Sequence, residues 1–308
     1  MTSLFLSAAL VLIAASASAQ SLSYGRSDYA TYQDPLMMLN GHAVPTSPLK
    51  AGLKELKITP AYITSYSHNA TGGGQSLEQS AGKSFSDNVA SGFGLSAAWL
   101  QGISEHWGWT VSATFSRMSG KTFAFGDHAA NGSLVKRHDA NEIGTAFQGA
   151  AMVIYDPFEG EGFRLPLFAG YGFLHQRQSA KYRARSTTLA GSPEISYTSE
   201  FTAFIPGAVF GASPQFNTGP LRWTPFIAIQ LKHNNPAFDN IVKNETTGAE
   251  LSRLESNNGD PFLGTLGLGV RYKPWDLDFK YIPNITGMTE EGLGASVYSI
   301  SKTFKFGE

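Results

Sequence analysis

After residue 53 the chain shows short stretches in which apolar and polar residues alternate. Alternation with a period of two puts successive side chains on opposite faces of an extended strand. In the first stretch, Leu56 and Ile58 share one face, and Lys57 and Thr59 share the other. The same pattern predicts strands at about 56–66, 89–99, 107–115, 143–155, 163–175, 200–213, 221–233, 262–272, 276–283 and 296–306.

The connections between these strands alternate in length. Short turns are predicted near 101–106, 156–162, 214–220 and 273–276, and mostly long polar segments near 68–87, 117–141, 176–198, 234–260 and 284–294. Short periplasmic turns and long extracellular loops are typical of barrels that cross an outer membrane. We therefore predict an all-β fold, a transmembrane antiparallel up-and-down β-barrel of about ten strands, with eight to twelve possible.

The composition fits a barrel that turns alternate residues toward lipid. Of the 308 residues, 33 are glycine, none is cysteine, 12% are aromatic and only 15% are charged. A chain without cysteine has no disulfides, so backbone closure has to supply its rigidity. The net charge of −1 gives no indication of a nucleic-acid partner. No cofactor is predicted.

The N-terminus reads as an export signal. An apolar run from Leu4 to Ala15 precedes small residues that end at Ala19, a pattern typical of a cleaved signal peptide. We divide the chain into a signal peptide (1–19), an N-terminal segment (20–53) and an outer-membrane barrel (54–308). The middle segment is either a periplasmic lead-in or an insert in the lumen, because its apolar run 35–39 would fit as a small plug. The predicted location is the outer membrane of a Gram-negative bacterium.

All five tryptophans lie in or near the predicted short turns. Amphipathic indole rings prefer the membrane interface. We therefore predict a periplasmic aromatic girdle made of Trp99, Trp107, Trp109, Trp223 and Trp275.

The end of the chain carries a family resemblance. Tyr298, Ile300, Phe304 and Phe306 fall on one face of the last predicted strand. This segment resembles the closing strand of bacterial outer-membrane barrels. The resemblance implies two partners, the outer-membrane lipids and the barrel-assembly machinery. Lys302, on the lipid-facing parity, departs from the family pattern.

Charged residues collect at inward positions near the predicted periplasmic end. A ten-stranded lumen is a borderline case between a filled barrel and an open one, so these residues have two interpretations. One is a constriction that biases a pore toward anions, and the other is a salt-bridge network that fills a narrow barrel. Strand pairing across the turn 273–276 would set Arg271 directly opposite Asp278. The full cluster is Lys57, Arg164, Arg222, Arg271, Asp276, Asp278 and Lys280.

Three classes of function remain open. The first is a narrow porin-like conduit for a small polar or anionic solute, or a structural surface barrel. The second is an enzyme that modifies lipid A or peptides at the extracellular rim, with His68 and His233 as candidate catalytic residues. The third is adhesin-like binding through the long loops. The spacing of the histidines matches no metal motif.

Overall fold

The computed structural model describes residues 45–69, 86–128, 134–158, 162–186, 195–232, 237–256, 262–282 and 293–306. The signal peptide predicted at 1–19, the apolar run 35–39 and the rim residue His233 lie outside the described residues. No helix in the ranges that are described is long and apolar enough to cross a membrane, a finding that concerns helical spans alone.

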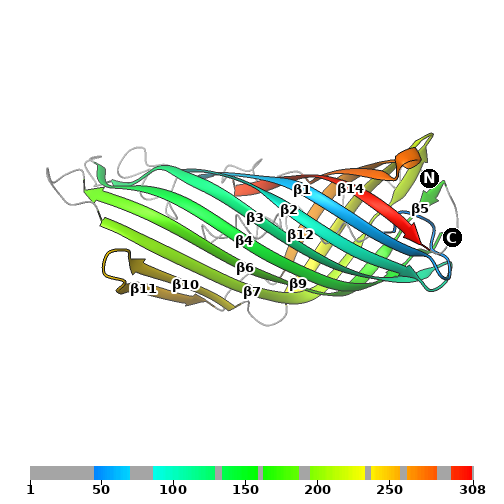
Figure 1. The fold of residues 1–308 in the computed structure, drawn as a ribbon, viewed down its shortest axis with the longest axis horizontal. Helices are drawn as coiled ribbons and strands as arrows, with labels where there is room; N and C mark the ends of the chain where they lie inside the picture. Colours follow the sequence, from blue (N-terminus) through cyan, green and yellow to red (C-terminus); the bar gives the residue numbers. More distant parts are fainter. Residues whose placement is uncertain are drawn as a thin grey trace.

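Ten antiparallel strands close into a barrel, as predicted (Figure 1). Each strand pairs with its neighbour along the chain, and β1 and β14 pair with each other, so the sheet is closed. The barrel strands are β1 (Lys54–Asn69), β2 (Ser86–Gly102), β3 (Trp107–His128), β4 (Leu134–Tyr155), β6 (Leu167–Ser186), β7 (Ile195–Ala212), β9 (Leu221–Lys232), β12 (Phe262–Tyr272), β13 (Leu277–Ile282) and β14 (Leu293–Phe306).

Within the described ranges, four short strands and one turn of 3-10 helix lie beyond these ten. The hairpin of β10 (Ala237–Asn244) and β11 (Glu250–Ser256) extends the sheet from β7 at one end of the barrel. At the other end, β5 (Phe163–Arg164) pairs with β8 (Gln215–Thr218), which itself pairs with β9. The 3-10 turn η3 (Lys273–Trp275) joins β12 to β13 at this same end. We call the end of the barrel that carries β5, β8 and η3 the short-turn end, and we call the opposite end the long-strand end.

Two segments predicted as loops are largely strand. The sequence pattern ends the third strand at about residue 115, but β3 continues to His128 and β4 begins at Leu134. The predicted loop 176–198 is likewise taken up by β6 as far as Ser186 and by β7 from Ile195. The physical reason is that the apolar/polar alternation fades where both faces of a strand meet a polar phase, whereas backbone pairing continues. The predicted loop 234–260 also contains the β10–β11 hairpin.

Burial alternates along the strands as the sequence predicts. In β1, Tyr62 is 41% exposed whereas the next residue, Ile63, is fully buried. In β2, Phe93 is 71% exposed and Ser96 is 1% exposed. Successive side chains therefore point out of the barrel and into it.

The outer face carries an apolar belt. Every barrel strand contributes at least one large hydrophobic side chain that is 38% exposed or more. One example from each strand is Tyr62, Phe93, Phe115, Phe147, Tyr171, Phe210, Ile229, Leu268, Phe279 and Ile300. Many of the buried inward side chains, by contrast, are hydroxyls, amides and charged groups. This polarity, apolar outside and polar inside, is the reverse of a water-soluble barrel.

Inward glycines make room for large neighbours on the adjacent strands. A side chain at Gly211 would overlap the ring of Phe168, and one at Gly267 would overlap the ring of Phe226. At Gly170 the obstacle is backbone, because an added Cβ would overlap the carbonyl oxygen of Ala151. These small positions are therefore filled by neighbouring atoms.

Because the backbone approaches Gly170 closely, even a methyl group at this position should lower the free energy of unfolding. In Gly170→Ala, β4 and β6 must shift apart, and overpacking of this kind costs about 1–3 kcal/mol. Gly162→Ala is the matched control, because an added Cβ at Gly162 meets nothing within 4 Å. Urea unfolding of the refolded protein in detergent, followed by heat-modifiable mobility, measures both variants. Equal stability of the two would contradict the close strand contact.

Candidate functional site

The segment before β1 turns into the short-turn end of the barrel. Residues 45–53 run alongside the end of β2, where the amide of Gly102 donates to the carbonyl of Leu53 at 2.8 Å. Leu49 and Leu53 are 3% and 1% exposed. We call residues 45–53 the end plug.

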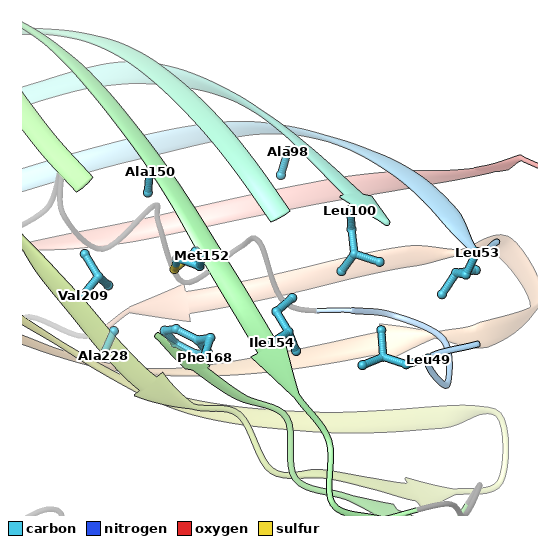
Figure 2. Packing of buried hydrophobic residues seen from close by; sticks show 10 residues of the cluster. All are labelled: Leu49, Leu53, Ala98, Leu100, Ala150, Met152, Ile154, Phe168, Val209 and Ala228. Carbon is cyan, nitrogen blue, oxygen red and sulfur yellow. The ribbon is translucent and has the colours of Figure 1, made fainter. Parts of the chain in front are cut away.

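Apolar side chains hold one side of the end plug. Leu49 and Leu53 belong to a buried cluster with residues of five barrel strands (Figure 2). Its other members are Ala98, Leu100, Ala150, Met152, Ile154, Phe168, Val209 and Ala228. A buried leucine contributes about 1.5–3 kcal/mol relative to an exposed one, so the two leucines anchor the plug firmly.

Charged residues gather on the other side, and the first group centres on Asp278. Its carboxylate lies 3.1 Å from the ammonium nitrogen of Lys57 and 3.4 Å from a guanidinium nitrogen of Arg271. The predicted register is confirmed, because Arg271 and Asp278 are direct partners across β12 and β13. Arg271 also pairs with Asp276, which stands in the left-handed conformation after η3.

The second group is a buried pair between Arg164 and Asp156. A guanidinium nitrogen lies 2.6 Å from the carboxylate, and Nε donates to the same oxygen at 2.7 Å. Both side chains are at most 2% exposed. Burial lowers the pKa of the Arg164 guanidinium, and the adjacent Asp156 carboxylate opposes that shift.

Arg222 and Gln215 connect the charged groups to the end plug. Gln215 accepts from Arg164 at 3.4 Å and donates to the carbonyl of Pro45 at 2.9 Å. Arg222 donates to the carbonyl of Thr46, and the Thr46 amide donates to Glu55 at 3.0 Å. The plug backbone therefore serves as both acceptor and donor within the network.

All seven predicted charged residues thus lie at the short-turn end, and the structure adds two acids to them. Lys280 is 6% exposed, and its ammonium nitrogen lies 5.3 Å from the ring centroid of Phe226. Glu55 and Asp156 were not predicted, although Glu55 stands on the inward parity of β1, and Asp156, the first residue after β4, continues the inward parity of that strand. The nine members are Lys57, Arg164, Arg222, Arg271 and Lys280, with Glu55, Asp156, Asp276 and Asp278. Five cations against four carboxylates leave little net charge.

The five tryptophans also lie at the short-turn end. The ring centroids of Trp107 and Tyr155 lie 4.7 Å apart in a tilted pair, those of Trp99 and Phe306 lie 5.9 Å apart in a stacked pair, and those of Trp275 and Tyr272 lie 5.3 Å apart edge to face. Trp223 donates from Nε1 to Thr218 at 2.9 Å, and Trp109 pairs with Gln101 across β2 and β3.

Lys302 keeps its outward position by reaching toward the short-turn end. Its ammonium group donates to the carbonyl of Trp275 in η3. A lysine on an apolar face often carries its charge to the edge in this way. The departure from the closing-strand pattern therefore has a local polar partner.

Of the two predicted rim histidines, the structure places His68 by its strand register. His68 stands near the long-strand end of β1, opposite Asp87 of β2 in the register. Its predicted partner His233 lies outside the described residues. Glu200, on β7, lies 3.5 Å from Lys243.

Comparison with known proteins supports no assignment of activity. No family model and no curated protein matches the chain. Among solved structures, the outer membrane protease OmpT of Escherichia coli has a TM-score of 0.48 and 8% identity over 85% of this chain and 96% of its own. The outer membrane protein OprG of Pseudomonas aeruginosa scores 0.34 with 10% identity, covering 84% and 98%. The attachment invasion locus protein Ail of Yersinia pestis scores 0.25 with 14% identity, covering 83% and 99%.

The barrels that this chain resembles are bacterial outer-membrane proteins with different names and roles. Their likeness leaves the function of this chain undetermined. The closed ten-stranded barrel rests on the strand pairing of the chain itself.

The buried Arg164–Asp156 pair predicts that removing the charge of Asp156 lowers the stability of the protein strongly. In Asp156→Asn, Arg164 keeps a buried charge without its carboxylate, which costs about 3–5 kcal/mol. Lys181→Gln is the control, because Lys181 and its partner Glu245 are 66% and 40% exposed and such a pair contributes about 0–1 kcal/mol. Urea unfolding measures both. A loss in Asp156→Asn no larger than in the control would contradict a buried ion pair.

Proposed function

We propose that the chain is an integral protein of a Gram-negative outer membrane, with its short-turn end in the periplasm. The apolar belt supplies the lipid-facing surface, and the polar interior is what a membrane barrel requires. The tryptophans at the short-turn end support its placement at a membrane interface. The closing strand β14 carries Phe304 and Phe306 outward, each 45% exposed, which supports recognition by the barrel-assembly machinery.

Within that membrane we propose a structural surface barrel whose periplasmic end is closed. The observation that carries this proposal is the end plug, which is fixed by buried leucines on one side and by Gln215 and Arg222 on the other. The near balance of charge in the cluster supports a structural network over an anion-selective constriction. One cation of the cluster, Arg222, already donates to the plug backbone at the carbonyl of Thr46.

The long-strand end supports a role at the cell surface. A strand needs about 9–11 residues to cross a bilayer, whereas β3 and β4 each have 22. The excess length and the β10–β11 hairpin lie together at the long-strand end, where they extend the sheet (Figure 1). Such an extended sheet suits contact with partners outside the cell, as in the adhesin-like alternative.

A gated conduit is the second candidate, and buried amides favour it. Gln148 and Gln176 point into the lumen and are each 1% exposed, and neither side-chain amide has a hydrogen-bond partner among the residues that the structure describes. Buried amides of this kind require water or a polar solute. Water around them would give the lumen a polar path that the end plug closes.

Conductance in a planar bilayer tests the closed barrel. We expect the refolded wild-type protein to give no discrete steps, because the end plug blocks the short-turn end. Discrete steps with anion preference in the wild type would contradict the proposal.

A second variant separates the two candidates. Leu49→Asp with Leu53→Asp introduces carboxylates into the apolar cluster and should release the end plug, and Ile103→Asp, at a residue that is 60% exposed, is the control. A structural barrel stays silent in both variants if lumen side chains such as Phe168 and Phe226 fill it without the end plug. Steps in the double variant alone would replace the structural barrel with the gated conduit.

A further inference from the structure

A row of basic residues crosses the outer face of β3, β4 and β6. In the strand register, Arg117 is opposite Thr145, and Thr145 is opposite Arg177. Both arginines are exposed and stand on the outward parity of their strands. Neighbouring strands lie about 4.8 Å apart, so the two arginine backbones are roughly 10 Å apart. We call Arg117, Thr145 and Arg177 the arginine row.

The arginine row stands at the upper edge of the apolar belt. Two residues nearer the short-turn end, the matching outward positions are Phe115, Phe147, His175 and Phe204. The three phenylalanines are 53%, 44% and 47% exposed. Two residues farther out, the row of Ser119, Ile143, Ser179 and Glu200 is already mixed. The arginines therefore mark the level at which the surface changes from apolar to polar.

Other outward cations near this level have acidic partners. Lys181 lies 2.9 Å from Glu245, and Lys243 lies 3.5 Å from Glu200. Neither Arg117 nor Arg177 has an ion pair with any residue that the structure describes. Two guanidinium groups on one face at the edge of an apolar belt therefore carry a local positive charge that no described residue pairs with.

We propose that the arginine row binds the phosphate group of an anionic lipid headgroup in the outer leaflet. A guanidinium fork matches phosphate oxygens with two parallel hydrogen bonds. The Thr145 hydroxyl, between the arginines, donates to the carbonyl of Arg177 at 3.5 Å, so the two guanidinium groups supply the donors for phosphate. Headgroup phosphates lie at the level where the hydrocarbon ends, which is the level of the row. The inference rests on the membrane placement proposed above.

Lipid retention in nanodiscs tests the row. The full mature chain is reconstituted in phosphatidylcholine containing phosphatidic acid, and native mass spectrometry counts the lipids that stay bound. The test variant is Arg117→Gln with Arg177→Gln, and the matched control is Lys181→Gln with Lys243→Gln, which removes the same charge from paired positions. We expect the wild type and the control to retain phosphatidic acid, and the test variant to bind it at least about tenfold more weakly.

Three outcomes would overturn the proposal. The wild type could retain both lipids equally, or the control could lose as much as the test variant, in which case general surface charge explains the binding. Inorganic phosphate at the same concentration could also displace the lipid completely, which would assign the row to a soluble anion.

Tryptophan quenching by brominated acyl chains separates this inference from the membrane placement. A barrel that is quenched yet shows no lipid preference contradicts the arginine row alone. A barrel that is not quenched contradicts the membrane placement itself.

Discussion

Closure of the backbone sheet is the constraint on which the rest of the structure depends. A bilayer offers no water to unpaired amides and carbonyls, so a spanning sheet has to satisfy them within itself. Here β1 pairs with β2 along its whole length and with β14 from Lys54 to Ser67. The closed ring then forces alternate side chains outward and inward, which produces both the apolar belt and the polar lumen.

A ten-stranded barrel has an interior that either side chains or water must occupy. The chain fills much of it by setting large side chains such as Phe168 and Phe226 against glycines. Charges that are buried in the same space have to be paired, because an isolated buried charge is costly. The buried guanidinium of Arg222 donates a hydrogen bond to the carbonyl of Thr46. The end plug thus helps to stabilise a buried charge.

The sequence predicts the parts that follow the period-two rule. Strand count, strand order and the pairing of Arg271 with Asp278 all follow from parity and turn length. Glu55 and Asp156 follow the same parity, so the period-two rule could have predicted them. The rule could not predict the long ends of β3 and β4, because their residues lack the alternation that lipid imposes. The contacts of Pro45 and Thr46 use backbone atoms, which leave no side-chain pattern in the sequence.

Thiol labelling at the end plug tests the central claim most directly. The natural chain has no cysteine, so single substitutions report without background. In the folded, membrane-inserted protein we expect Leu49→Cys to resist a polar maleimide, whereas Lys54→Cys, at an exposed position, reacts readily. Unfolding in urea should make both react at the same rate. Labelling of Leu49→Cys in the folded protein as fast as Lys54→Cys would contradict a barrel closed by residues 45–53.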